Sequence, residues 1–238
     1  MSHERKFLDT LFASSTAFTA GNSCWNTDGY VGPGATVNVP PVTPVLNNLH
    51  LSNIQAGTGP SNRIGSQVVC DSLHLRYRIV PNGLSQGLVN HLRLVVFADN
   101  ECDGAYPTGA EVLTYFGPTQ APNSLAFLEL GYGGRFSVLA DENIILKENA
   151  YWNGASEVSG SFDGELYHER NIDLKGKHKL NWDMTGNSTV TNLRQGHIFV
   201  LAWWCSSTVS AGVISTVYNN PPQFHGIARL RFRDVNSA

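Results

Sequence analysis

Apolar and polar residues alternate with a period of two through several segments of the chain. In residues 68–80 the apolar side chains are Val69, Leu73, Leu75, Tyr77 and Ile79, and the alternate positions include His74, Arg76 and Arg78. This alternation is typical of a β-strand with one buried and one exposed face. The same pattern predicts half-buried strands over residues 135–143, 172–182 and 227–233.

Two further segments, residues 91–98 and 197–205, are apolar at nearly every position. Such runs predict strands that are covered on both faces, the first of them near the centre of a sheet. Residues 213–218 add a shorter apolar strand, and no long stretch keeps the spacing of an amphipathic helix. One short helix is expected within a long loop at residues 106–130. The chain is therefore predicted to be all-β, with about seven to nine strands.

Strands of this number, joined by long loops, favour an eight-stranded antiparallel jelly-roll sandwich. An immunoglobulin-like sandwich is disfavoured because its Cys…Trp…Cys spacing is absent. Residues 1–53 are expected to form an N-terminal strand and a Pro/Gly-rich extended strap, since repeated prolines prevent ladder pairing. Residues 54–238 then form the jelly-roll domain, and the two parts make one structural domain.

Composition predicts that much of the surface is polar but uncharged or is covered by partners. Charged residues make up 15% of the sequence, against about 25% in typical soluble proteins, which favours a homo-oligomer. The net charge is −3, so any contact with a polyanion is expected to be local. The four cysteines form no C-x-x-C pair, which indicates neither a zinc knuckle nor a disulfide framework. No secretion signal and no membrane-spanning run is expected.

Five segments carry a more specific pattern, and their order along the chain matters. They are Glu4-Arg-Lys-Phe-Leu-Asp-Thr10, the Gly-rich residues 54–65, Arg93-Leu-Val-Val-Phe-Ala-Asp99, Arg135-Phe-Ser-Val-Leu-Ala-Asp141 and Arg229-Leu-Arg-Phe-Arg-Asp234. In this order they resemble the capsid proteins of circular, Rep-encoding single-stranded DNA viruses, relatives of the circovirus and satellite tobacco necrosis virus shells. The resemblance implies a jelly roll that self-assembles into a closed icosahedral shell around single-stranded DNA.

The N-terminus departs from the pattern of that family. The resemblance implies an Arg/Lys-rich arm that neutralises packaged phosphates, yet residues 1–50 contain only Arg5 and Lys6 as cations. We expect that such an arm has been removed ahead of Glu4. The alternative is that the genome is recruited through the inner wall of the shell alone.

Cations occupy the polar positions of three predicted strands. If these faces lie together on the inner wall, they would form a phosphate-binding surface with salt-dependent affinity. We expect at least the stripe around Arg231 to face partly inward. The alternative for each strand is an ordinary solvated face or a subunit contact, and for Arg63 a simple pairing with a nearby carboxylate or carbonyl. The predicted nucleic-acid-binding residues are Arg229, Arg231, Arg233, Lys175, Lys177, Lys179, Arg76, Arg78 and Arg63.

Other candidate residues give weaker signals. The turn at Asp99, Glu101 and Asp103 resembles the opening of a calcium loop, but its twelfth residue is Ala110, so a solvated turn is favoured and no metal site is assigned. Consecutive strand residues face opposite sides, so one of Trp203 and Trp204 is expected in the core and the other at an interface. The prolines of the strap, Pro40 and Pro41, are expected to contact neighbouring subunits.

No catalytic motif stands out in the chain. The eight histidines show no metal-binding spacing, and there is neither a G-x-S-x-G elbow nor a P-loop. We therefore expect a non-enzymatic capsid protein without cofactors, in a virion of the smallest triangulation, T=1. Its partners would be identical subunits, single-stranded DNA and a host receptor, with assembly in the host nucleus or cytoplasm and no membrane. A carbohydrate- or receptor-binding β-sandwich is the alternative, and a cupin-type enzyme is disfavoured because clustered metal ligands are missing.

Overall fold

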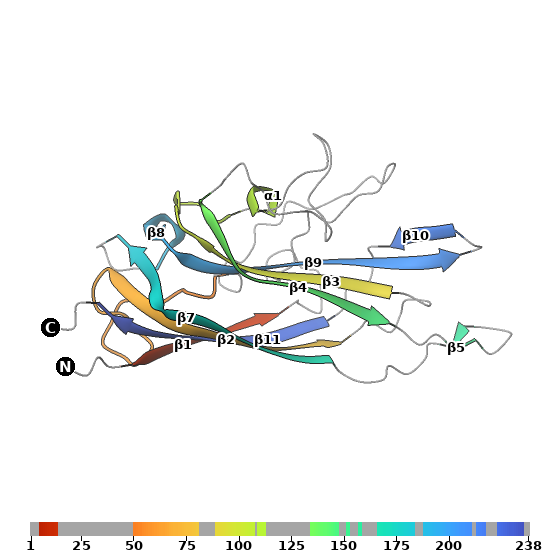
Figure 1. The fold of residues 1–238 in the computed structure, drawn as a ribbon, viewed down its shortest axis with the longest axis horizontal. Coiled ribbons are helices and arrows are strands. Elements are labelled where there is room, and N and C mark those ends of the chain that lie inside the picture. Colours follow the sequence, from red (N-terminus) through yellow and green to blue (C-terminus); the bar gives the residue numbers. More distant parts are fainter. Residues whose placement is uncertain are drawn as a thin grey trace.

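The computed structural model describes residues 5–13, 50–80, 89–107, 109–112, 134–147, 151–152, 157–158, 166–183, 188–210, 213–217 and 223–235. Most of these residues lie in β-strands (Figure 1). The strands are β1 Lys6–Ala13, β2 Gln67–Val80, β3 Val89–Asp99, β4 Phe136–Lys147, β5 Tyr151–Trp152, β6 Glu157–Val158, β7 Leu166–Trp182, β8 Leu193–Gln195, β9 His197–Ser210, β10 Val213–Val217 and β11 Gln223–Asp234. The helices are the single turn α1, Gly109–Val112, and a 3-10 turn at Val190–Asn192.

The strands form two main antiparallel sheets. The first has the order β1-β11-β2-β7-β8 and the second the order β10-β9-β3-β4, while β5 and β6 make a separate two-stranded ribbon. The two main sheets lie one above the other in Figure 1. The all-β prediction is therefore confirmed, and each predicted strand is present with longer or shifted ends. No helix among the described residues has the length and apolar character needed to cross a membrane.

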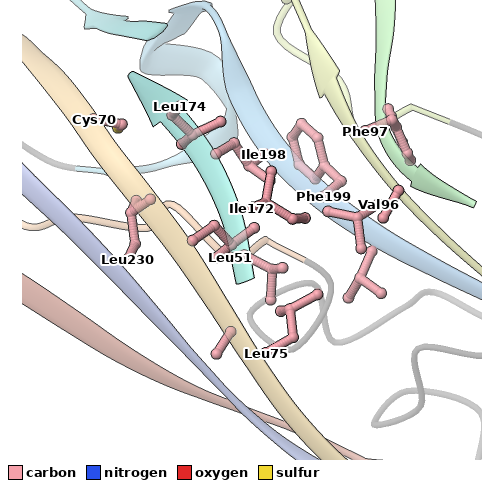
Figure 2. Packing of buried hydrophobic residues seen from close by; sticks show 14 of the residues in the cluster. Leu51, Cys70, Leu75, Val96, Phe97, Ile172, Leu174, Ile198, Phe199 and Leu230 are labelled. Atoms are coloured by element: carbon pink, nitrogen blue, oxygen red, sulfur yellow. The ribbon is translucent and has the colours of Figure 1, made fainter. Parts of the chain in front are cut away.

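One hydrophobic core lies between the two sheets. Leu75, Ile172 and Leu230 approach it from the first sheet, and Val96 and Phe199 from the second (Figure 2). Strand β3 pairs with β9 on one side and β4 on the other, and it is buried from Arg93 to Asp99. This confirms the prediction that its continuous apolar run is covered on both faces.

Strand β2 departs from the predicted alternation at one point, because it contains a β-bulge at Asp71. The pattern placed Val69 on the buried face, but Val69 is half-buried, whereas Val68 and Cys70 are fully buried. The register of β2 shifts between Cys70 and Ser72 against its neighbours on both sides. The extra residue reverses the period of two, so alternation counted from Leu73 gives the wrong face for Val69.

The predicted strap and long loop are only partly described. Residues 14–49 lie outside the described residues, and so do Pro40 and Pro41. The segment that follows them is anchored on β9, because the Leu51 N–H donates to the Ile198 carbonyl (2.8 Å) and His50 bridges Phe199 in antiparallel fashion. Helix α1 falls within residues 106–130, where one short helix was expected.

Candidate nucleic-acid interface

The face of the first sheet that points away from the core gathers cations from three neighbouring strands. Strand β11 lies beside β2, and β2 lies beside β7. Their exposed or half-buried cations are Arg229, Arg231 and Arg233 on β11, Arg76 and Arg78 on β2, and Lys175, Lys177 and Lys179 on β7. We call this surface the basic face. The three predicted cationic stripes therefore lie side by side, although they come from distant parts of the sequence.

The alternation of each strand places these side chains on the outer side. In β11 the residues Ala228, Leu230 and Phe232 are buried, so the arginines between them point outward. Cross-strand pairing then sets their neighbours: Arg229 lies opposite Asp9 and His74, Arg231 opposite Phe7 and Ser72, and Arg76 opposite Ile227 and Glu169. The register is thus what turns three separate stripes into one surface.

Lys175 and Gly176 stand apart from this regular pattern. They lie in the bulge of β7 opposite Asp71, and both have positive φ angles, 55° and 59°. The Lys175 N–H donates to Asp173 Oδ1 (2.8 Å), which holds the tight turn of the bulge. Lys175 and Lys177 are both exposed there, and Lys179 lies opposite Val69 where the regular ladder resumes.

Carboxylates neutralise only part of the basic face. Arg229 donates two hydrogen bonds to Asp9, from Nε at 2.7 Å and from Nη2 at 2.6 Å. Glu169 accepts from His74 (2.6 Å) and Arg76 (3.1 Å), and Arg233 approaches Asp71 at 3.8 Å. These hydrogen bonds hold the pKa of Asp9 below its ordinary value, through Arg229, and that of Glu169 below its own, through His74 and then Arg76.

The remaining cations leave the face with an excess of positive charge. Eight lysines and arginines share it with four carboxylates, Asp9, Asp71, Asp173 and Glu169, although the whole chain carries −3. Within the described part of the chain, no carboxylate forms an ion pair with Arg231, Lys177 or Lys179. A polyanion could therefore approach these three groups without displacing an existing partner.

Arg63 does not belong to this surface. Its side chain is buried, donates to the Gly65 carbonyl, and lies over the Trp182 ring with 4.4 Å between the guanidinium carbon and the ring centroid. This is the structural role that was the alternative to nucleic-acid contact. The geometry gives no support to a nucleic-acid contact by Arg63.

Two residues on the basic face were not singled out from the sequence. Phe7 on β1 is 43% exposed and Tyr167 on β7 is 59% exposed, and both face outward among the cations. Alternation through residues 6–12 was the signal available for Phe7, since Lys6 is buried and Phe7, Asp9 and Leu11 are exposed. Their place beside arginines depends on strand pairing, which the sequence does not show.

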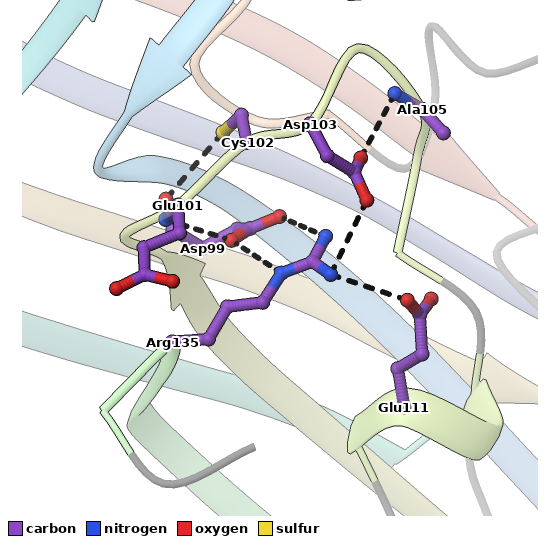
Figure 3. A network of polar contacts seen from close by, with 7 residues as sticks. All are labelled: Asp99, Glu101, Cys102, Asp103, Ala105, Glu111 and Arg135. Atoms are coloured by element: carbon purple, nitrogen blue, oxygen red, sulfur yellow. Dashed lines mark hydrogen bonds and ion pairs between the residues drawn. The ribbon is translucent and has the colours of Figure 1, made fainter.

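The turn considered for calcium is organised around a guanidinium. Asp99 is fully buried and accepts two 3.0 Å hydrogen bonds from Arg135, which also contacts Asp103 (3.4 Å) and Glu111 (3.2 Å). Figure 3 shows the Glu101 carboxylate directed away from this cluster. Among the described residues no group of three metal-ligating side chains converges. The cation that these carboxylates surround is thus Arg135.

The tryptophans proposed as interface anchors are placed only by their backbone. Trp203 lies opposite Arg93, and Trp204 opposite Leu92, in the ladder between β9 and β3. Their side chains lie outside the described part of the structure, so their assignment to core and interface stays a prediction.

A buried polar cluster that the sequence did not reveal joins the segment at residues 50–52 to β9. His50 Nε2 lies 3.1 Å from His197 Nδ1 and 3.0 Å from Ser52 Oγ, and all three residues are fully buried. His197 Nε2 donates to the Asn181 carbonyl (2.9 Å). Burial lowers the pKa of His50 well below its ordinary value and that of His197 to about 4. Both imidazoles are therefore neutral near pH 7.

No protein-family model matches this chain, and no curated protein matches it.

Proposed function

We propose that this chain is a viral capsid subunit, of which identical copies assemble into a small icosahedral shell around a single-stranded DNA genome. The observation that carries the proposal is the basic face: three strands distant in sequence bring their cations to one side of one sheet. The other main sheet, β10-β9-β3-β4, contributes none of these cations. A subunit with one cationic side is suited to a shell whose inner wall meets phosphates.

The order of the strands supports a jelly roll. In that fold the first strand lies beside the last, the last beside the third, and the third beside the sixth. Here β1, the first strand, pairs with β11, the last, and β11 pairs with β2, which pairs with β7. His50 bridges Phe199 on the edge of β9, which is the edge that the second strand of a jelly roll occupies. On this assignment β3, β4 and β9 are the fourth, fifth and seventh strands.

Exposed apolar side chains support assembly. Leu11 lies on the edge strand β1 and Ile145 on the edge strand β4, and both are well exposed. Ile64 and Val235 are also exposed, next to the hydrogen bond that joins the Ile64 N–H to Asp234. Single exposed apolar residues are common, but apolar residues on sheet edges are where contacts between subunits would bury them.

Size-exclusion chromatography followed by electron microscopy tests assembly directly. We expect closed particles of uniform diameter. A monomer at all concentrations and ionic strengths would contradict the proposal and favour the alternative of a receptor-binding β-sandwich.

Nucleic-acid packaging is tested by a pair of variants matched in charge. Arg231→Gln with Lys179→Gln removes two cations from the basic face, and Arg170→Gln with Arg194→Gln removes two exposed cations elsewhere. We expect the first variant to form particles with less nucleic acid, measured as the ratio of absorbance at 260 and 280 nm, and the second to package normally. Equal packaging by both variants would show that the basic face does not meet the genome.

A further inference from the structure

Phe7, on the edge strand β1, exposes an aromatic ring beside the arginines of the basic face. It lies directly opposite Arg231 across the β1–β11 ladder, and the guanidinium carbon of Arg229 lies 4.8 Å from its ring centroid. Asp9 fixes Arg229 in this position through two hydrogen bonds. The ring is therefore flanked by one arginine that is held in place and by a second, Arg231, that forms no ion pair with any described residue.

Tyr167 repeats this arrangement three strands away, on the same face of the sheet. It lies across from Arg78 on β2, and its hydroxyl donates to Glu169 Oε2 (3.2 Å). Glu169 in turn accepts from Arg76. An exposed aromatic ring thus again stands next to arginines, one of which a carboxylate holds in place.

The register connects the two rings by a diagonal across four adjacent strands. Each step moves over one strand and along by two residues: from Phe7 on β1 to Arg229 on β11, to Arg76 on β2, and to Tyr167 on β7. Diagonal neighbours of this kind lie about 7–8 Å apart. The path therefore runs from ring to guanidinium to guanidinium to ring across the basic face.

We infer that the diagonal Phe7–Arg229–Arg76–Tyr167 is a binding track for single-stranded nucleic acid, with bases stacked on Phe7 and Tyr167. Phosphates would bind the Nη1 groups of Arg229 and Arg76, which make no hydrogen bond to Asp9 or Glu169, and Arg231 opposite Phe7. Aromatic rings on a cationic surface bind single strands by stacking, because every unpaired base offers a π-face. The bases of a duplex are already stacked on one another, so a duplex can use only the charges of this track. The inference rests on the proposed function and adds the mode of binding at the same face.

Fluorescence anisotropy with three labelled probes tests the inference on the full chain, at concentrations below those at which particles form. The probes are oligo-dT, an abasic strand of the same length and a duplex of the same length. The test variant is Phe7→Leu with Tyr167→Leu, which keeps apolar side chains but removes both rings. Leu11→Ala is the control, because Leu11 lies on the same face of β1 and is more exposed than Phe7.

We expect the double variant to bind oligo-dT at least tenfold more weakly, with its affinity for the abasic strand unchanged, since stacking on each ring supports base binding alone. The control variant should bind all three probes as the wild type does. Phe7→Trp, which enlarges the ring, should bind oligo-dT more tightly and the abasic strand equally well. These results would support stacking even if one substitution altered the local fold.

Two other outcomes separate the inference from the proposed function. Wild-type protein that binds oligo-dT and the abasic strand equally, or a double variant that weakens both equally, overturns the stacking track and leaves the basic face as a phosphate surface. Wild-type protein that binds none of the three probes at low ionic strength overturns nucleic-acid binding at this face altogether.

Discussion

Lys6 Nζ lies 2.9 Å from Asp234 Oδ2, and both side chains are only 3% exposed. Lys6 also donates to the Asn62 carbonyl (3.1 Å), and Asp234 Oδ1 accepts from the Ile64 N–H (2.9 Å). One buried ion pair therefore joins β1, the Gly-rich segment before β2, and the end of β11. Three parts of the chain that are far apart in sequence depend on it.

Replacing one partner of this pair should be costly. We expect Asp234→Asn to lower the free energy of unfolding by about 3–5 kcal/mol, because it leaves the Lys6 ammonium buried without its counter-charge. The amide oxygen of asparagine can still accept from the Ile64 N–H, so the loss reports the charge rather than that hydrogen bond. Urea denaturation of the dissociated chain measures the change.

The matched control is an exposed pair. Arg194 donates to Asp183 at 2.7 Å near the surface, so Arg194→Gln should leave the unfolding free energy nearly unchanged. Lys6→Met combined with Asp234→Asn should recover part of the stability lost by Asp234→Asn, because no buried charge remains. An Asp234→Asn variant as stable as Arg194→Gln would show that the pair is effectively solvated.

The fork of hydrogen bonds from Arg135 to buried Asp99 supports a second prediction (Figure 3). We expect Arg135→Lys to destabilise the fold by about 1–3 kcal/mol, because an ammonium cannot make the two parallel hydrogen bonds of a guanidinium. Arg135→Met should cost more, since it leaves the Asp99 carboxylate buried and unpaired. Thermal unfolding of both variants gives the order, and equal stability of the two would contradict this account.

The period of two in the sequence was enough to locate the strands and most of their buried faces. Leu230 and Phe232 on β11 are buried as the pattern predicted, because side chains alternate strictly along a regular strand. The pattern failed at Val69, where the bulge at Asp71 reverses the faces. A bulge depends on how neighbouring strands pair, and nothing in the residues 68–73 marks it.

Prediction of the basic face was limited even more by the unknown pairing of the strands. Alternation predicted that Arg229, Arg231 and Arg76 are exposed, but whether their strands are neighbours is set by contacts between distant segments. The same limit applies to Arg63, whose burial against Trp182 joins two segments more than a hundred residues apart. Local sequence describes one strand at a time, whereas the basic face is a property of the sheet.

Two glycines with similar backbone conformations allow a test of close packing. Gly196 and Gly134 have φ angles of 77° and 100°, so alanine is strained at both. A Cβ at Gly196 would lie 2.0 Å from the Lys179 carbonyl oxygen, whereas a Cβ at Gly134 would have nothing within 4 Å. We expect Gly134→Ala to cost about 1–2 kcal/mol and Gly196→Ala distinctly more, measured by chemical denaturation. Similar costs would mean that β7 and β8 separate easily at this point.

The buried pair of imidazoles, His50 and His197, should make the fold sensitive to mild acid. Burial lowers the pKa of both, that of His197 to about 4, whereas an unfolded histidine titrates near 6.5. His178 and Arg63 add positive charge nearby, which further disfavours protonation of His197. Between pH 4 and pH 6.5 the unfolded chain binds more protons than the folded one. The free energy of unfolding therefore keeps its full value above about pH 6.5 and falls as the pH decreases toward 4.

Each histidine then lowers the unfolding free energy by roughly 1.4 kcal/mol for each pH unit below about 6.5. The carboxylates of Asp9 and Glu169, whose pKa values are lowered, stabilise the fold above their unfolded pKa values, near 4, and lose this effect only in stronger acid. The interval from pH 6.5 to 5 thus isolates the histidines. Urea denaturation across it should show the decline in the wild type and a much flatter profile in His50→Gln with His197→Gln, and a flat wild-type profile would contradict the burial of neutral imidazoles.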